Sequence, residues 1–330
     1  MEQRNTPKVS VIVPIYRVEK YIEKCAVYLL EQTLDDIEII FIDDCSPDNS
    51  MKVLEETLAR YPERKDCVRV YRNPQNCGLV ANRKKGIELA TGEYITHCDS
   101  DDWVDRNLYE ALYNKAKETN SDVAVCPFRW EYADKSYDLP LAQLPNTCHE
   151  LLVNWYRIGT GMNHCNKIIR RSILIEHDLY PYEDTGAFED ASMMFRAFYY
   201  AGGLTQIDNA VYHYNRTNLG AVTSQVNRKS VDRLIRAAGL VTDFFKAQPD
   251  YEEYKKTCLV LQYFAKLDLV NTSFEWLKDF HKIYPKSDAI VNELSLMSFS
   301  SKGRFRFWFV KHHLAWLFVL MFKVYSKIKK

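Results

Sequence analysis

Residues Tyr94–Trp103 read YITHCDSDDW, and the rest of the chain is organised around this stretch. A short apolar run ends in three carboxylates, Asp99, Asp101 and Asp102. Carboxylates this close repel one another, so their pKa values rise unless a cation or hydrogen-bond donors compensate them. A divalent metal would do so, with Asp99 and Asp101 on one face if strand geometry continued. The alternative is an Asp-rich turn that caps the helix expected over residues 105–117, because Asp favours the N-cap position.

Strands and helices alternate four times up to the end of this stretch. We expect buried, β-branched strands at 9–14, 37–42, 68–71 and 93–98, and helices at 18–32, 51–61 and 79–90. Such alternation favours a mainly parallel sheet with helices on both faces. Ligands bind beyond the carboxyl ends of the strands in sheets of this kind, and Tyr16, Asp43 and Asp44 fall there together with the acidic stretch.

The second half of the chain changes in pattern. A further strand is expected at 122–127, an irregular stretch with room for a hairpin at 129–146, and an apolar helix at 191–200. Residues 211–214 are the last strand candidate, and only helical patterns follow from about residue 229. We therefore expect an α/β domain over residues 1–228 and a helical region over residues 229–330.

The tail, residues 302–330, contains a continuous apolar run at 314–322. That run is well short of the roughly 20 apolar residues that span a bilayer. Basic residues flank it on both sides, and aromatic residues precede it, which is typical of an interfacial helix attracted to anionic lipid. The alternative is a C-terminal helix that packs on its own domain.

The composition of the chain indicates which binding partners and which cellular compartment to expect. Lysine plus arginine and aspartate plus glutamate are equal at 44 each, so no global field attracts nucleic acid. The nine cysteines are scattered without a Cys-x-x-Cys pair, which indicates reduced thiols in a reducing compartment rather than a disulfide framework or a zinc site. The polar N-terminus lacks the apolar core of an export signal, so a cytoplasmic location is expected.

Five motifs appear in the order seen in family 2 glycosyltransferases: residues 9–16, 41–46, 76–86, 90–95 and 99–103. The chain resembles a bacterial polysaccharide-type member of that family densely over 8–127, thinly over 163–225, and not beyond about 230. The resemblance implies an α/β GT-A fold, a Rossmann-like and mainly parallel sheet flanked by helices, followed by a helical C-terminal region. It also implies a nucleotide-sugar donor, with UDP as the expected nucleotide.

By this resemblance the acidic stretch serves a metal on the donor side. The departing diphosphate gains negative charge, which Mn²⁺ or Mg²⁺ held by carboxylates would offset. Asp101 is expected to bind the metal, and Asp99 the metal, the ribose hydroxyls or a metal-bound water. Ser100 is expected in the same nucleotide-sugar site, whereas Asp102 either contributes or only caps the helix. His213 is a further metal candidate, with a packed or hydrogen-bonded histidine as the alternative.

The resemblance also places residues around the nucleotide. Asp43 corresponds to the aspartate that accepts a hydrogen bond from the base, and Asp44 beside it organises the loop or contacts the nucleotide. Arg83 corresponds to a basic residue near the base or diphosphate, where its guanidinium suits phosphate oxygens. Its alternative is a solvated helix face. The floor and wall of the pocket are expected from three consecutive residues: Pro14, Ile15 and Tyr16.

The acceptor side rests on Glu189 and Asp190. An inverting transfer proceeds by in-line attack of a hydroxyl, and a carboxylate must take its proton. The resemblance implies Asp190 as this general base and Glu189 as a residue that orients the acceptor or the helix start. The alternative is an acidic pair that only interacts with the helix dipole. Asn166 and Lys167 resemble a Trp-Asn-Lys segment of relatives, but Cys165 stands where Trp is common, which leaves their acceptor-side role open.

The expected activity is an inverting, metal-dependent glycosyltransferase of the hexosyltransferase type. It would move a sugar to a hydroxyl of a saccharide or lipid-linked saccharide in capsular or surface polysaccharide synthesis, peripherally on the inner face of the cell membrane. One alternative is a sugar-nucleotide nucleotidyltransferase, which would carry a Gly-rich loop where residues 14–17 read PIYR. A second is a non-catalytic nucleotide- or saccharide-binding protein.

Overall fold

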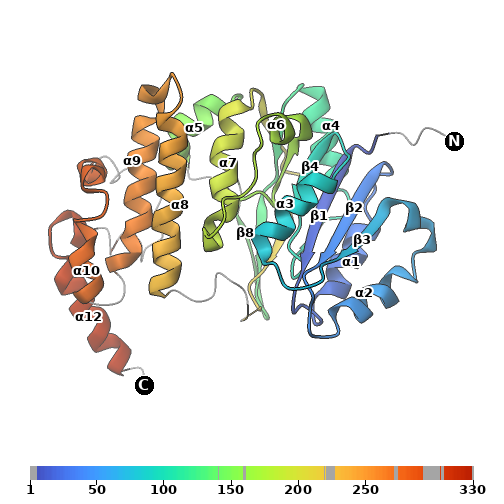
Figure 1. The fold of residues 1–330 in the computed structure, drawn as a ribbon, viewed down its shortest axis with the longest axis horizontal. Helices are drawn as coiled ribbons and strands as arrows, with labels where there is room; N and C mark the ends of the chain where they lie inside the picture. Colours follow the sequence, from blue (N-terminus) through green and yellow to red (C-terminus); the bar gives the residue numbers. More distant parts are fainter. Residues whose placement is uncertain are drawn as a thin grey trace. The chain divides into compact units, whose positions relative to one another are not determined.

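The computed structural model describes residues 6–139, 141–158, 161–218, 220, 227–270, 274–292, 305 and 308–328 (Figure 1). Contacts divide the chain into two compact units. The first comprises Met1–Leu151, Gly161–Glu183 and Glu189–Ser224, and the second Leu152–Thr160, Asp184–Phe188 and Gln225–Lys330. The domain boundary expected between residues 228 and 229 stays a prediction.

The first unit is built on a seven-stranded, mostly parallel sheet in the order β10-β6-β9-β4-β1-β2-β3. The expected α/β architecture is confirmed. Every residue of β1 and β2 is buried, because both strands are covered on each face. The strands are β1 Val9–Ile15, β2 Ile37–Asp43, β3 Val68–Arg72, β4 Tyr94–His97, β6 Val123–Val125, β9 Lys167–Arg170 and β10 Leu204–Gln206.

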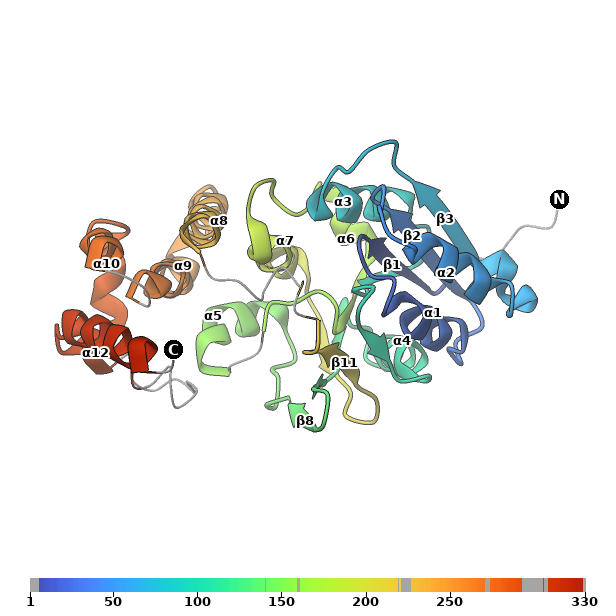
Figure 2. The same ribbon diagram turned by 90° about the horizontal axis from the view of Figure 1, so that it is seen from below.

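Helices cover both faces of this sheet (Figure 2). On one face α1 buries Cys25 and Leu29 in the same cluster as Val11 of β1. On the other face α3 approaches β1 so closely that a Cβ on Gly86 would lie 2.2 Å from Cγ2 of Ile12. The helices of this unit are α1 Ile22–Leu30, α2 Ser50–Leu58, α3 Leu79–Leu89, α4 Leu108–Glu118, α6 Arg171–Glu176 and α7 Glu189–Tyr200, with a 3₁₀ turn at Pro62–Cys67. Most of α5 Cys148–Ile158 and the 3₁₀ turn Gly186–Phe188 belong to the second unit.

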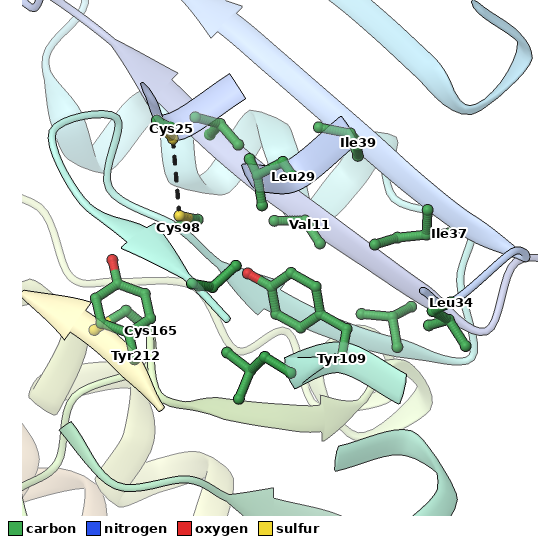
Figure 3. Packing of buried hydrophobic residues seen from close by; sticks show 14 of the residues in the cluster. Val11, Cys25, Leu29, Leu34, Ile37, Ile39, Cys98, Tyr109, Cys165 and Tyr212 are labelled. Atoms are coloured by element: carbon green, nitrogen blue, oxygen red, sulfur yellow. Dashed lines mark hydrogen bonds between the residues drawn. The ribbon is translucent and has the colours of Figure 1, made fainter. Parts of the chain in front are cut away.

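The core beneath α1 and α4 reaches the acidic stretch (Figure 3). Cys98 lies in this core with its Sγ 3.9 Å from that of Cys25, as two thiols. Tyr212 enters the same cluster from the last strand. The residues directly before Asp99 are therefore held by packing.

A second, four-stranded sheet in the order β5-β11-β7-β8 completes this unit. The hairpin for which residues 129–146 leave room is formed by β7 and β8, and β11 pairs in parallel with β7 and antiparallel with β5. The strands are β5 Trp103–Val104, β7 Phe128–Glu131, β8 Ser136–Leu139 and β11 Tyr212–Asn215.

The second unit is helical, as the sequence pattern predicts. Its core gathers Val260, Tyr263 and Phe280, and buried Lys266 donates to the carbonyls of Ile283 and Tyr284 and to Asp288. Its elements are α8 Arg228–Lys246, α9 Tyr251–Leu267, α10 Phe274–Phe280 and α12 Ala315–Ile328, with 3₁₀ turns at Asp268–Val270 and Pro285–Asn292.

Within the described part of the chain, no helix combines the length and the apolar character that crossing a bilayer requires. Seven residues of the tail predicted at 302–330 lie outside the described residues, namely 302–304, 306–307 and 329–330.

Candidate active site

The acidic stretch forms a turn at the carboxyl end of β4. The strand ends at His97, and the amide of Asp102 donates to the carbonyl of Asp99 at 3.0 Å. Strand geometry therefore does not continue to Asp99 and Asp101, so the condition under which they would share a strand face is not met. The helix-cap alternative is wrong, because α4 begins at Leu108 after Asn107. These carboxylates are placed by neither strand alternation nor helix capping.

Asp102 ties this turn to β11. Its Oδ2 accepts from the Tyr212 hydroxyl at 2.7 Å and its Oδ1 from the Asn215 amide at 2.8 Å. Burial and the neighbouring charges of Asp101 and Asp99 raise the pKa of Asp102 well above its usual value. The hydroxyl of Tyr212 also accepts from the backbone N–H of Asp99 at 3.1 Å. This buried side chain fixes the shape of the turn.

Asp101, next to Asp102 in sequence, accepts hydrogen bonds from two asparagine side chains. Asn218 Nδ2 donates to Asp101 Oδ2 at 2.7 Å, and Asn215 Nδ2 donates to the Asp101 carbonyl at 3.0 Å. Burial and the charge of Asp99 raise the pKa of the Asp101 carboxyl. Asp101 therefore occupies a site where a cation would relieve electrostatic repulsion. Ser100 is buried within the same turn.

Arg83 of α3 joins the two acidic groups of the site. It is 3 % exposed, so the solvated-face alternative is wrong. Its Nη2 donates to Asp99 Oδ1 at 2.9 Å, and its Nε lies 3.1 Å from Glu189 Oε1 as an ion pair outside hydrogen-bond geometry. Burial opposes its charge, but Asp99, Glu189 and Asp190 outweigh burial and raise the pKa of Arg83. Among the described residues, its Nη1 has no hydrogen-bond partner.

Glu189 and Asp190 open α7 beside this guanidinium. Burial raises the pKa of Glu189, and the charge of Arg83 opposes that rise. Burial and the charge of Glu189 raise the pKa of Asp190 to about 8, against the opposing charge of Arg83. Its Oδ1 accepts from the amide of Ala191 at 2.6 Å. A carboxylate with a pKa this high is a stronger base than an ordinary one, and the group is mostly unprotonated only above about pH 8.

The ends of β1 and β2 form a second part of the site. Asp43 is 6 % exposed and its Oδ1 accepts from the Ser46 amide at 2.8 Å, with Arg72 Nε 3.9 Å from Oδ2. Pro14 and Ile15 belong to β1 and pair with Ile42 and Asp43 of β2. Tyr16 follows them and is 41 % exposed.

Asp44 holds the loop that leads into α3. Its Oδ1 accepts from the Cys77 amide at 2.7 Å and from Asn73 Nδ2 at 3.1 Å, and its Oδ2 from the Gly78 amide at 2.9 Å. The loop ends at Gly78, whose φ of 85° suits glycine. Asp44 thus positions the start of the helix that carries Arg83.

The ring nitrogens of His213 are paired with carboxylates outside the acidic turn. Its Nδ1 is 2.7 Å from Glu131 Oε1 and its Nε2 3.0 Å from Asp105 Oδ1, and its ring stacks on Trp103 at 5.2 Å. Binding a metal would require one of these bonds to break. We therefore leave His213 out of the residues proposed to hold the metal.

The structure adds residues that the sequence reasoning missed. Asn218 was not singled out, although an amide shortly after a strand end is a signal for a polar loop. His97 stacks on His164 with ring centroids 4.3 Å apart, and burial together with the charge of Arg83 lowers both pKa values well below the usual range. Lys167, already named from the sequence together with Asn166, donates to the carbonyls of Gly161 and Asn163 and so holds the loop before β9.

The donor set fits a divalent metal that is completed by substrate. No three His, Cys, Asp or Glu side chains converge as a metal site in the residues that the structure describes. Carboxylate oxygens are hard ligands, and Mg²⁺ is commonly bound by one or two carboxylates together with substrate phosphates. Asp99, whose side chain is 30 % exposed, and Asp101 offer such oxygens.

Comparisons with known proteins show which family this chain is similar to. The family model described as glycosyl transferase family 2 matches residues 10–178. EpsH of Bacillus subtilis (strain 168), provisionally named a glycosyltransferase, is 32 % identical over 259 residues, which cover 76 % of this chain and 73 % of EpsH.

Solved structures share the fold at low sequence identity. TarS 1–349 of S. aureus in complex with UDP-GlcNAc has a TM-score of 0.70 at 18 % identity and covers 97 % of this chain and 92 % of that one. The mannosyltransferase PcManGT of Pyrobaculum calidifontis in complex with GDP-Man and Mn²⁺ has a TM-score of 0.55 at 14 % identity, with 98 % and 87 % covered. These likenesses support the fold.

Proposed function

The chain belongs to glycosyl transferase family 2, and we propose that it transfers a sugar from a UDP-linked donor to a hydroxyl of a saccharide or lipid-linked saccharide, with inversion. The family assignment decides against the nucleotidyltransferase alternative. We place the reaction in capsular or surface polysaccharide synthesis and assign catalysis to residues 1–228, with residues 229–330 as a helical extension.

One observation carries this proposal: Arg83 lies between the donor-side carboxylate Asp99 and the acidic pair Glu189 and Asp190. An in-line transfer needs a positive group where a diphosphate departs and a base where a hydroxyl arrives. The buried Nη1 of Arg83 has no hydrogen-bond partner among the residues that the structure describes, and we assign it to a phosphate oxygen of the donor. Asp190, with its raised pKa, would take the proton of the attacking hydroxyl.

The donor nucleotide would lie over the ends of β1 and β2. Asp43 would accept from the base, and Tyr16 offers an exposed ring beside it. The three donors on the Asp44 carboxylate support a role in shaping this pocket rather than in contacting the nucleotide. The ligands in these two compared structures, UDP-GlcNAc and GDP-Man, are both nucleotide sugars, and that chemistry supports the proposed donor class.

Asp101 and Asp99 would hold Mn²⁺ or Mg²⁺ together with the diphosphate. The metal, when bound, supplies Lewis-acid stabilisation of the leaving diphosphate. Asp99 would then share its carboxylate between the cation and Arg83. Asp102, with both oxygens already bonded to β11, would keep the turn in shape.

The test is a panel of nucleotide sugars assayed for nucleotide release, with saccharide acceptors present. We expect turnover with a UDP-sugar, and loss of turnover with retained UDP binding in Asp190→Asn. Retained turnover in Asp190→Asn would exclude this residue as the base. Loss of both UDP binding and turnover with an intact fold would instead place Asp190 in the donor pocket.

We also propose that the tail binds the inner face of an anionic membrane. Trp308 and Trp316 are each 50 % exposed, and Leu320 and Met321 are exposed near them in sequence. Aromatic and apolar side chains with basic neighbours suit the lipid interface. Removal of residues 302–330 should release the protein from phosphatidylserine vesicles. Equal binding of full-length and shortened protein would exclude this role.

A further inference from the structure

The four-stranded sheet exposes aromatic side chains that the proposed reaction does not use. Trp130 of β7 is 37 % exposed and Tyr137 of β8 is 48 % exposed. They are direct partners in the antiparallel register, so both side chains lie on one face of the hairpin. Figure 2 labels β8 and β11 in this sheet.

These rings border an open hollow of about 510 Å³. The Tyr132 and Tyr137 rings meet edge to face with centroids 5.7 Å apart. The lining is half aromatic and also carries a cation, a carboxylate and an apolar side chain: Trp130, Tyr132, Lys135, Tyr137, Asp138 and Leu139. The surface therefore combines flat apolar area with hydrogen-bonding groups of both signs.

Two cationic side chains lie against the exposed rings of Trp130 and Tyr137. The Arg216 guanidinium carbon lies 5.6 Å from the ring centroids of Trp130 and Tyr214, and Lys135 Nζ lies 5.6 Å from that of Tyr137. The backbone of Arg216 is held by its amide, which donates to the Glu131 carbonyl at 2.7 Å. Such contacts keep an exposed ring in place before a ligand arrives.

The same face of the small sheet leads back to the acidic turn. Tyr214 and Tyr212 are two residues apart on β11 and so lie on one face. Phe128 packs edge to face on both, at 5.5 Å from Tyr212 and 6.5 Å from Tyr214. Tyr212 then bonds to Asp102 at 2.7 Å. The exposed rings are thus joined to the site by packed side chains.

We propose that Trp130, Tyr132 and Tyr137, with Arg216 and Lys135 at the rim, bind a sugar unit of the acceptor beyond the one that reacts. The C–H faces of a pyranose pack on aromatic rings, and its hydroxyls bond to charged donors and acceptors at the ring edges. A lipid chain would offer no hydrogen-bonding groups to the hydroxyls of Tyr132 and Tyr137 at this surface, whereas a sugar would. The Asp138 carboxylate already accepts from Arg129 Nε. This subsite rests on the proposed function and identifies the acceptor as an oligosaccharide rather than a single sugar.

The experiment compares the full-length wild type with the double variant Trp130→Ala/Tyr137→Ala. Saccharides of one to four glucose, galactose or N-acetylglucosamine units are screened for binding by saturation-transfer NMR. The KM of the best acceptor is then measured. Loss of two ring contacts should raise this KM about tenfold with kcat nearly unchanged. UDP binding measured by calorimetry should not change.

Two matched variants separate ring stacking from structure. Trp130→Phe/Tyr137→Phe keeps the rings and should restore most of the affinity. Phe274→Ala removes a ring of similar exposure, 38 %, from the helical unit and should behave as wild type.

Different results would contradict the proposed glycosyl transfer and the proposed sugar subsite. A wild type that binds no UDP and turns over no nucleotide sugar contradicts the proposed function and, with it, the subsite. A wild type that binds UDP and turns over a donor, but shows no oligosaccharide signal or the same KM as Trp130→Ala/Tyr137→Ala, overturns the subsite alone. Loss of UDP binding in the double variant also overturns it, because the hairpin would then support the donor pocket.

Discussion

The raised pKa of Asp190 predicts a steep dependence of activity on pH. If the unprotonated carboxylate is the base, only about 3 % of the enzyme is active at pH 6.5 with a pKa of about 8, and about 90 % at pH 9. kcat/KM should therefore rise about 30-fold between these values and level off above them. The pH dependence of kcat/KM reports the pKa values of the free enzyme, which is the form that the structure describes.

Glu189→Gln tests the cause of this shift. The charge of Glu189 is second only to burial in raising the pKa of Asp190, so its removal should move the midpoint of the pH profile to lower pH. The midpoint is informative even if the variant is slower, because a change in rate alone does not move it. Glu183→Gln, which removes an exposed carboxylate nearby, should leave the midpoint in place. An unchanged midpoint in Glu189→Gln, or a flat wild-type profile, would refute the assigned base.

Three further predictions concern stability and metal. Arg83→Met leaves buried carboxylates without their cation and should lower the free energy of unfolding by about 3–5 kcal/mol at pH 8, measured by urea denaturation; a change below about 1 kcal/mol would contradict the buried ion pair. The folded pKa of Asp190 is raised, so the folded state binds its proton more tightly and stability falls as pH rises from about 4 to about 8. Asp190→Asn should therefore gain in melting temperature over wild type across that window, and a constant difference would contradict the shift. Thorough chelation by EDTA should abolish turnover and Mn²⁺ or Mg²⁺ should restore it, whereas full activity in EDTA would exclude a metal at Asp101.

The β1 to β4 half of the sheet could be predicted because its signals are local. Residues 9–15 and 37–42 are apolar apart from Ser10 and Glu38, and a polar loop follows each strand. β9 and β10 were missed, since strands of four and three residues carry little periodicity and β9 lies between β4 and β6, which are distant from it in sequence.

The site was predictable as a set of residue types but not in its geometry. The acidic turn bonds to Tyr212, Asn215 and Asn218, more than a hundred residues away, and nothing near Asp101 in sequence indicates these partners. Whether Arg83 faced solvent or the interior also depended on the position of α7. The local sequence pattern indicated which residue types belong to the site. Contacts between residues distant in sequence determine which carboxylates are hydrogen-bonded within the protein and which can bind a ligand.

The bonds from β11 to the acidic turn also set an order of events during synthesis. Asp102 emerges from the ribosome 110 residues before Tyr212 and 113 before Asn215. Strands β1 to β4 can pair while translation continues, but contacts this distant in sequence close late. Until then the turn has Arg83 as a donor to Asp99 but lacks the donors to Asp101 and Asp102. We therefore expect the turn to take its final shape only after β11 has been synthesised.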